Sequence, residues 1–258
     1  MIQILYTDRE SSDRGDLLQT GNRPLERLFN GITISYDRMN RLLTLGMDQR
    51  WRRRAAGLVA EFDPDRVLDL CTGTGDLAFL LAKTLKEGTR ITGLDYSPHM
   101  LEQAQKKRPS GRNYPDFVLG DAAALPFPAD SFDTVTISFA FRNLTYHNPR
   151  MKSYLSEIRR VLKPDGIFVI IESAQPNIRI IRKMRDLYVE IMVGKIVSSL
   201  SGHRSAYRYL ADSVKRYFGP EEIGILLRSA GFSSVEYAPL FFGAVGLYRA
   251  HGRVENST

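Results

Sequence analysis

The sequence predicts an α/β fold, a doubly wound and mostly parallel seven-stranded sheet with helices on both faces. Two observations lead to this prediction. From Arg66 onward, short apolar segments alternate with helical stretches, which is the pattern of successive βαβ units. A turn of Gly73, Thr74 and Gly75 joins the first apolar segment to the helix after it. We therefore expect right-handed connections and a ligand crevice at the carboxyl ends of the strands.

Composition limits the class of protein. Of the 258 residues, 43% are hydrophobic and 25% are charged, which is typical of a globular domain and not of a disordered, collagenous or coiled-coil chain. The single cysteine, Cys71, excludes a disulfide framework and a multi-cysteine metal site, so we expect a reducing compartment and no metal. No apolar run approaches the roughly 20 residues that span a bilayer, and residues 1–16 lack the core of a signal peptide. We expect a cytoplasmic protein.

The residues before the alternating pattern predict an arm followed by helices. Residues 1–22 are polar and without periodicity, as expected of a flexible arm. A single domain over residues 23–258 follows, and it begins with an N-terminal helical region, residues 23–62. Within it, residues 36–45 and 48–62 are expected to be helices. The basic run at residues 50–54 is interpreted as a solvated face.

The sheet region is expected to contain seven strands and four helices. The strands are expected at residues 66–70, 89–94, 116–119, 132–138, 167–171, 233–238 and 241–249. The helices are expected at residues 76–86, 97–107, 148–162 and 220–230. Ser97 and Asn148, each followed by proline, are the expected N-caps of two helices, and Gly231 ends the last helix. Residues 163–166 (KPDG) are expected to form a turn before the fifth strand.

The alternation stops after the fifth strand, over residues 173–219, and this insertion is basic. Between Asn177 and Tyr217 there are nine Lys and Arg but three Asp and Glu, which accounts for most of the net charge of +7. Apolar residues recur there at helical spacing with charged residues between them: Ile178, Ile181, Met184, Tyr188 and Ile191. Two interpretations remain open. The segment is an ordinary amphipathic helix packed on the core, or a helical lid whose basic face meets anionic lipid.

The glycine turn predicts a nucleotide-like ligand. Gly73 and Gly75 allow the backbone to approach a ligand at the amino end of a helix, and Asp95, at the end of the second strand, can accept hydrogen bonds from ribose hydroxyls. The loop also fits the relaxed dinucleotide fingerprint, so NAD is the alternative. Two acidic positions favour S-adenosylmethionine. Asp69, just before the loop, suits a cationic sulfonium, and Asp121 with Ala122, after the third strand, suits an adenine.

Eight segments of the chain resemble the menaquinone/ubiquinone biosynthesis C-methyltransferase family. They are YDRMNRLLTLGMDQRWRR (36–53), DLCTGTGDLA (69–78), GLDYSPHML (93–101), GDAAALPFPADSFD (120–133), TISFAFRNL (136–144), EIRRVLKPDG (157–166), AYRYLADSV (206–214) and GAVGLYRA (243–250). SFAFRN and YRYLADSV are the specific ones, because generic methyltransferases lack them. The resemblance implies a class I, Rossmann-like methyltransferase fold.

The resemblance implies methyl transfer to a ring carbon of a prenylated hydroquinone. Demethylmenaquinone is the leading acceptor, and a ubiquinone-pathway acceptor or another aromatic small molecule is the alternative. The cofactor is expected to be S-adenosylmethionine. Its expected site comprises Asp69, Gly73, Thr74, Gly75, Asp95, Tyr96, Asp121, Ala122 and Ser138. The residues expected to line the acceptor site are Tyr36, Phe141, Glu172, Tyr207 and Tyr209.

Arg142 and Asn143, after the fourth strand, are the expected catalytic residues. A ring carbon is a poor nucleophile until a neighbouring hydroxyl loses its proton, and a free phenol has a pKa of about 10. An adjacent cation favours the phenolate, and arginine stays protonated. A structural ion pair is the other interpretation of Arg142.

The expected partners follow from the same chemistry. They are a prenylated quinol and, at the inner face of the cell membrane, an anionic lipid surface that the protein contacts peripherally. The net charge also raises the alternative of an RNA methyltransferase, but no RNA-binding module or base-reading motif accompanies it, and nucleic acid is not expected. The sequence leaves the oligomeric state open, a homodimer included.

Overall fold

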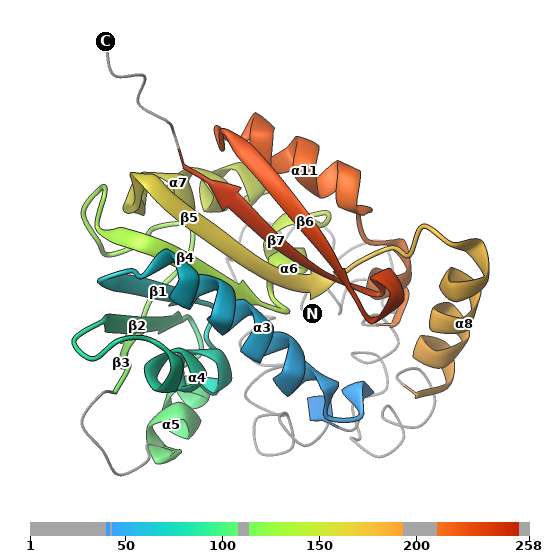
Figure 1. Ribbon diagram of the computed structural model, residues 1–258, viewed down its shortest axis with the longest axis horizontal. Coiled ribbons are helices and arrows are strands. Elements are labelled where there is room, and N and C mark those ends of the chain that lie inside the picture. Colours follow the sequence, from blue (N-terminus) through green and yellow to red (C-terminus); the bar gives the residue numbers. More distant parts are fainter. Residues whose placement is uncertain (1–39, 42, 108–113, 193–210, 253–258) are drawn as a thin grey trace, which may run out of the picture.

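Seven strands form one sheet in the order β3-β2-β1-β4-β5-β7-β6 (Figure 1). The computed structural model describes residues 40, 41, 43–107, 114–192 and 211–252. The strands are β1 (Arg66–Leu70), β2 (Arg90–Asp95), β3 (Asp116–Leu119), β4 (Phe132–Ser138), β5 (Leu162–Ser173), β6 (Ser234–Leu240) and β7 (Val245–His251). The helices whose two ends both lie among the described residues are α3 (Met47–Phe62), α4 (Asp76–Thr84), α5 (Pro98–Lys106), α6 (Phe141–Thr145), α7 (Met151–Val161), α8 (Arg179–Val189), α11 (Pro220–Ser229) and the 3₁₀ turn η2 (Phe241–Gly243). The expected arm lies outside the described residues.

The predicted sheet is confirmed in strand number and direction. β1 to β5 pair in parallel, and β7 runs antiparallel to both β5 and β6. β1 lies in the middle, between β2 and β4, so the chain builds the sheet outward first to one side and then to the other. Ligands of doubly wound sheets bind at this reversal point, beyond the carboxyl ends of the strands.

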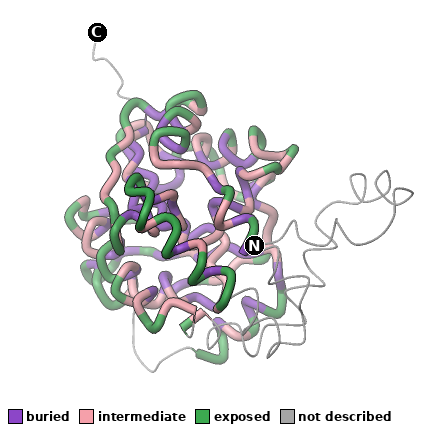
Figure 2. The backbone as a smooth tube through the Cα atoms, turned by 90° about the vertical axis from the view of Figure 1, so that its right-hand side faces the viewer, coloured by how far each residue is buried: buried purple, intermediate pink, exposed green. Residues whose placement is uncertain are grey.

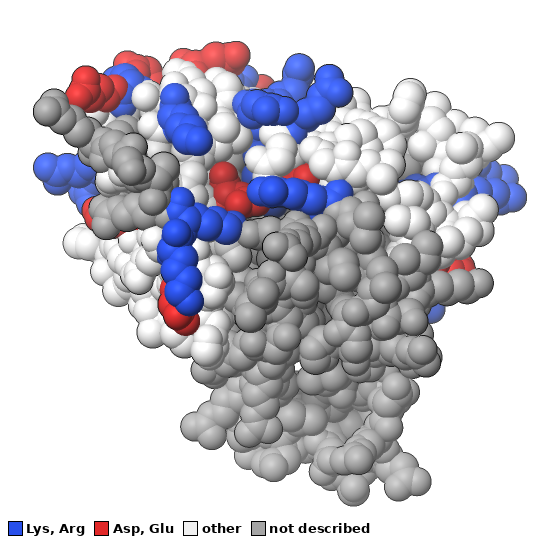
Figure 3. Space-filling view, turned by 90° about the horizontal axis from the view of Figure 1, so that it is seen from below, with Lys and Arg blue, Asp and Glu red and all other residues white. Residues whose placement is uncertain are grey.

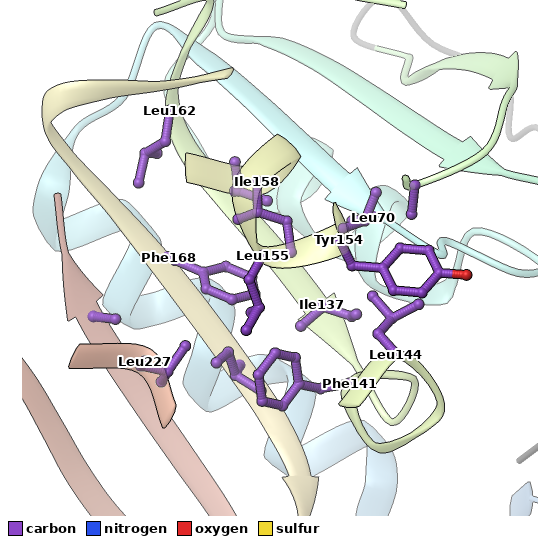
Figure 4. Packing of buried hydrophobic residues seen from close by; sticks show 14 of the residues in the cluster. Leu70, Ile137, Phe141, Leu144, Tyr154, Leu155, Ile158, Leu162, Phe168 and Leu227 are labelled. Carbon is purple, nitrogen blue, oxygen red and sulfur yellow. The ribbon is translucent and has the colours of Figure 1, made fainter. Parts of the chain in front are cut away.

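Two apolar layers cover the sheet, one on each face. β5 shows why both faces are buried, because alternate residues of its apolar run point in opposite directions. Phe168 and Ile170 join the layer that α6, α7 and α11 cover, shown in Figure 4. Ile167, Val169 and Ile171 join the other layer, which α3 and α4 cover.

The strand β5 starts earlier than the sequence pattern indicates. Residues 163–166, expected to form a turn, are extended within β5 instead. Lys163 forms an ion pair with Asp133 of the neighbouring strand, and a side chain on Gly166 would meet the Asp133 carbonyl oxygen at 2.8 Å. The pairing with β4 is irregular next to Asp133, which accommodates the additional residues.

The ends of some other helices and strands differ from the predicted ones, because tertiary contacts determine them. Phe241 and Phe242, expected to open the last strand, form η2 with φ of 45° and 55°, because the chain must reverse between the antiparallel strands β6 and β7. Asn148 is not the N-cap of α7. Its Oδ1 accepts a hydrogen bond from the Arg150 amide, and Arg150 precedes the helix directly. The short helix α6 was not anticipated.

The insertion after β5 contains α8, which stands apart from the sheet (Figure 1). Figure 2 faces that side of the molecule, and α8 is largely exposed there. Large apolar side chains remain exposed on one side of it, Ile180, Met184 and Leu187 among them, whereas Arg185 and Val189 on the other side are buried. The structure therefore leaves both interpretations of this segment open. Among the described residues, no helix is long and apolar enough to cross a membrane.

Buried Arg185 and exposed Tyr188 tie α8 to the rest of the chain. The Arg185 guanidinium donates to the Ala174 carbonyl at 2.7 Å and to the Gln175 amide oxygen at 2.8 Å, both just beyond β5. The Tyr188 hydroxyl donates to the Leu43 carbonyl at 2.9 Å, before α3. The helix therefore bridges two parts of the chain that are distant in sequence.

Candidate active site

The loop after β1 opens a cleft at the carboxyl edge of the sheet, which we call the glycine-loop cleft. Gly73 and Gly75 have φ of 57° and 80°, which favours glycine at both positions. A side chain on Gly75 would collide with the rings of Phe79 and Phe117, whereas the space above Gly73 is open. Gly75 is therefore required for packing and Gly73 lines the cleft.

The carboxylate of Asp95 is held in place by backbone amides in this cleft. It is buried, and its two carboxylate oxygens accept hydrogen bonds from the amides of Gly73 at 2.8 Å and Ser97 at 2.9 Å. Burial raises the pKa of Asp95 to about 6, although these backbone donors oppose the shift. Each carboxylate oxygen has a second lone pair, so Asp95 can also accept from a pair of ligand hydroxyls.

Most of the other expected cofactor residues line the same cleft. Those on its wall are Tyr96, Asp121, Ala122 and Ser138. One Asp121 oxygen accepts from the Ala123 amide at 2.9 Å, and the other pairs with Arg150 at 2.8 Å. Asn143, expected to be catalytic, also lies here. The cleft thus combines two acids and a glycine loop contributed by consecutive strand ends.

Three expected cofactor residues do not line the cleft. Asp69 is 1% exposed and accepts hydrogen bonds from Thr72 at 2.6 Å and Thr136 at 2.8 Å, so it holds the loop to β4 and does not face a cationic ligand as expected. Burial raises its pKa to about 6. Thr74 is buried and accepts from the Lys107 ammonium at 2.7 Å. Gly75 packs against aromatic rings.

A second, larger cavity of about 570 Å³ adjoins the cleft, and we call it the apolar cavity. Its volume falls within the range of small-molecule sites. Its walls come from six parts of the chain, namely residues 40 and 43–52, the residues just after β4, the end of β5, α8, Val214, and the turn η2 with the start of β7. Most of its lining is apolar, so it fits a hydrophobic ligand.

Arg142 and Glu172 provide buried charge on the wall of the apolar cavity. Arg142 is 4% exposed and Glu172 is 1% exposed. Their side chains form an ion pair of 3.9 Å, and the Arg142 amide donates to the Glu172 carboxylate at 3.0 Å. The Arg142 guanidinium also donates to Ser213 at 2.5 Å. Arg142 therefore takes part in the expected ion pair and also lines the cavity, and its catalytic role stays a prediction.

The remaining expected acceptor residues lie elsewhere. Phe141 is fully buried and its ring packs against Phe168, 5.8 Å away between centroids, so it belongs to the core and not to the cavity wall as expected (Figure 4). Tyr36, Tyr207 and Tyr209 lie outside the described residues.

Phe139 lies between the two cavities with Trp51 and Arg52 beside it, and none of the three was among the expected site residues. Phe139 lines both cavities and has a φ of 57°, uncommon for a large residue. Trp51 lies 6.0 Å from its ring, and the Arg52 guanidinium lies 5.4 Å above it. Arg52 is buried, contrary to the expected solvated face. Asp48, four residues before Arg52 on the same helix, was the available signal.

The match to a family model shows to which protein family this chain belongs. The model of the ubiE/COQ5 methyltransferase family matches residues 18–251. The chain belongs to this family. The demethylmenaquinone methyltransferase of Thermotoga maritima is 42% identical over 223 residues, which cover 86% of this chain and 93% of that protein. The ubiquinone/menaquinone biosynthesis C-methyltransferase UbiE of Geobacter sulfurreducens is 36% identical, covering 90% of this chain and 89% of that protein.

Solved structures support the fold. A SAM-dependent methyltransferase from Aquifex aeolicus superposes with a TM-score of 0.54 at 19% identity, covering 76% of this chain and 88% of that chain. Human N-acetylserotonin methyltransferase in complex with SAM gives 0.55 at 21% identity, covering 87% and 59%. The class I, Rossmann-like fold is thereby confirmed.

This family member is a methyltransferase that depends on S-adenosylmethionine, and the glycine-loop cleft fits that cofactor. Asp95 presents acceptors for ribose hydroxyls, and Asp121 with the backbone beside Ala122 presents an acceptor and a donor for an adenine edge. The bound cofactor supplies a methyl group activated on a sulfonium. The protein has to align the acceptor and exclude water.

Proposed function

We propose that this methyltransferase methylates a ring carbon of a prenylated hydroquinone, with demethylmenaquinol as its acceptor. The names of its relatives support this acceptor class, because the Thermotoga protein is called a demethylmenaquinone methyltransferase. The apolar cavity supports it independently. A cavity with a mostly apolar lining suits an aromatic ring and the beginning of a prenyl tail.

The position of Arg142 is the observation on which the proposal mainly depends. Arg142 lies on the wall of the apolar cavity, and the next residue, Asn143, lines the glycine-loop cleft. The guanidinium is therefore close to the junction where an acceptor meets the cofactor. A buried cation beside a ring hydroxyl favours the phenolate and stabilises the charge that moves into the ring during attack. The carbon that accepts the methyl group then loses its hydrogen as a proton, which restores the aromatic ring.

Glu172 positions Arg142 in this proposal. Its carboxylate accepts from the Ser173 amide at 2.8 Å and the Ser173 hydroxyl at 2.7 Å, in addition to the Arg142 amide. These donors hold the Glu172 carboxylate in place independently of the guanidinium. A fixed carboxylate beside a guanidinium limits the rotamers of Arg142 and keeps its charge at the cavity wall.

A benzoquinol of the ubiquinone pathway is the second candidate acceptor. The name of the Geobacter relative includes both quinones, which favours testing the two together. Methyl transfer from labelled cofactor should be measured with chemically reduced demethylmenaquinol and the corresponding demethylated benzoquinol. We expect the higher kcat/KM with demethylmenaquinol. Transfer to the benzoquinol alone would reverse the assignment, and transfer to neither would refute the acceptor class.

We also propose that the protein is cytoplasmic and docks on the anionic inner face of the cell membrane, since a prenylated acceptor resides in lipid. Ile180, Met184, Leu187 and Ile191 form an exposed stripe at helical spacing along α8 and beyond its end. Exposed Arg179, Arg182 and Lys183 flank this stripe. In Figure 3, cationic side chains lie at the edge of the face on the side where Figure 1 places α8. Apolar and cationic residues side by side are typical of an interfacial helix.

The turn η2 extends this apolar surface to the cavity. Phe241 and Phe242 are 49% and 77% exposed, and both line the apolar cavity together with Met184 of α8. Leu45, 68% exposed, lies on the same rim. An acceptor entering from lipid would therefore meet a continuous apolar surface from the membrane to Phe139.

Vesicle flotation tests this docking. Each cation near an anionic surface contributes about 1 kcal/mol. We expect binding that increases with phosphatidylglycerol content and weakens with salt. A charge-reversal variant, Lys183→Glu, should bind less, whereas Lys152→Glu on α7 serves as an exposed control. Equal recovery on neutral and anionic vesicles would contradict the proposal.

A further inference from the structure

A cluster of four charged residues lies between α3 and the glycine loop, and none of the four is among the expected cofactor, acceptor or catalytic residues. Asp48 and Arg52 come from α3, Asp76 begins α4, and Lys107 follows α5. Arg52 forms an ion pair with Asp48 and lies 4.0 Å from Asp76. Lys107 pairs with Asp76 at 3.0 Å. The cluster has two cations and two anions, so its net charge is zero.

Much of this cluster is removed from water. Asp48 is 2% exposed and Arg52 is 8% exposed. Buried ion pairs contribute little to stability, because desolvation offsets the attraction, and apolar residues of similar volume often stabilise a fold as well or better. A contribution to fold stability therefore does not explain why these charges are buried. A role in binding a charged ligand is the better explanation.

The position of Arg52 identifies which part of a ligand it faces. Its Nε donates to the Ser138 hydroxyl at 3.1 Å, and Ser138 lines the glycine-loop cleft. Its guanidinium also lies above the ring of Phe139, which separates the cleft from the apolar cavity. Arg52 itself lines the apolar cavity, so it lies where that cavity meets the Ser138 end of the cleft.

The order of the strands orients the cofactor along the cleft. Asp121 follows β3 and Asp95 ends β2, the glycine loop follows β1, and Ser138 ends β4. Because these strands are neighbours in that order, the adenine and ribose positions lie on one side of the glycine loop. The amino-acid end of S-adenosylmethionine would then extend past the glycine loop toward β4, where Arg52 contacts Ser138 and lies 4.0 Å from Asp76.

We infer that this cluster holds the amino-acid end of S-adenosylmethionine, with Arg52 binding its carboxylate. That end is a zwitterion, which a neutral set of paired charges matches: a guanidinium attracts the carboxylate, and Asp76 attracts the ammonium. Arginine suits this task because its planar fork can bind a carboxylate while Asp48 fixes its orientation. Arg52 is thereby a positioning residue that aligns the reactive end of the cofactor with the acceptor.

Two ligands that differ only in the amino-acid end provide the test. S-Adenosylhomocysteine carries that end, and 5′-methylthioadenosine has the same nucleoside and sulfur without it. Calorimetry on the folded protein measures the affinity for each, independently of methyl transfer. Loss of one charged hydrogen-bond partner should weaken S-adenosylhomocysteine binding by roughly tenfold to hundredfold in Arg52→Met. Binding of 5′-methylthioadenosine should change by less than about twofold, since it lacks the charges that Arg52 attracts.

Two further variants keep the inference testable. Arg54→Met removes an exposed arginine from the same helix and should leave both affinities unchanged. Arg52→Lys retains the charge if Arg52→Met fails to fold, and it should restore part of the S-adenosylhomocysteine affinity. An equal loss for both ligands in either Arg52 variant would indicate a structural role and overturn the inference. Unchanged S-adenosylhomocysteine binding in Arg52→Met would overturn it as well.

Discussion

The glycine-loop cleft is formed at the ends of neighbouring strands, whereas the apolar cavity is assembled from segments far apart in the chain. In the cleft, Asp95 is fixed by backbone amides from its own loop and from the glycine loop. In the cavity, α8 depends on single side chains such as Arg185 and Tyr188 for its attachment. The difference indicates that the proposed cofactor site is formed by the sheet itself, while the proposed acceptor site depends on the elements added to the sheet.

The largest effect that separates the two regions is expected at Arg142. Arg142→Gln should lower kcat by about 10² to 10³, the range for a removed electrostatic stabiliser, with little change in cofactor affinity. The Glu172 carboxylate retains the Arg142 amide and the Ser173 donors, so the fold should persist. Steady-state kinetics and calorimetry on the same preparation measure both quantities.

The pH dependence of Arg142→Gln sharpens this prediction. Higher pH supplies phenolate from solvent, so the variant should recover part of its rate as pH rises. Arg142→Lys should rescue poorly if the planar fork is needed. A variant with nearly normal kcat would refute the catalytic role, and one that only unfolds would leave Arg142 with the ion pair alone.

The next largest effect is expected in the cleft, at Asp95. Asp95→Ala removes charged hydrogen bonds to the ribose hydroxyls, so S-adenosylmethionine affinity should fall by at least about tenfold. Calorimetry measures it, and Asp116→Asn, an exposed acid on β3, is the matched control. Unchanged affinity in Asp95→Ala, or tight NAD binding by the unaltered protein, would contradict the assignment.

Protonation of Asp95 should make cofactor binding depend on pH. Its pKa of about 6 means that the carboxyl is mostly protonated at pH 5 and mostly ionised at pH 7. Because hydroxyl donors prefer the ionised form, affinity should rise by about tenfold between these values and level off above them. Asp95→Asn should remove the dependence. Asp69→Asn should keep it, because Asp69 titrates in the same range but does not line the cleft.

The smallest effect is expected on the acceptor side, at Phe242. Replacing this exposed ring by serine should weaken vesicle binding by about three- to tenfold, given the apolar area that it offers to lipid. It should raise the KM for the prenylated acceptor and leave cofactor affinity unchanged. Ile225→Ser, on α11, removes another exposed apolar side chain, away from this surface, and should have no effect. Identical results for both variants would place the docking surface elsewhere.

Sequence reasoning succeeded where the chemistry is local. Gly73, Asp95 and Asp121 each follow an apolar strand, so their place at one edge of the sheet follows from parallel pairing. The parallel sheet could also be predicted from local sequence. A strand that is buried on both faces is continuously apolar, as residues 167–171 of β5 are.

Sequence reasoning failed where tertiary packing decides. Arg52 was placed on a solvated face because its neighbours are basic, yet it reaches Ser138, 86 positions away. Phe141 was assigned to the acceptor site, but the helix α6 turns it into the core. No periodicity in the sequence reveals that Phe139, Trp51 and η2 meet, because their contacts depend on how α3 lies on the sheet.

Methyl transfer with ¹³C-methyl-labelled S-adenosylmethionine and reduced demethylmenaquinol tests the central claim most directly. The site of the new methyl group in the product can be read by NMR. In the proposed mechanism, the stabilised phenolate moves its charge into the ring. We therefore predict a methyl group bound to a ring carbon, with both hydroxyl oxygens unmodified. A methyl ether on either oxygen, or no labelled product while the protein still binds S-adenosylmethionine, would contradict the account.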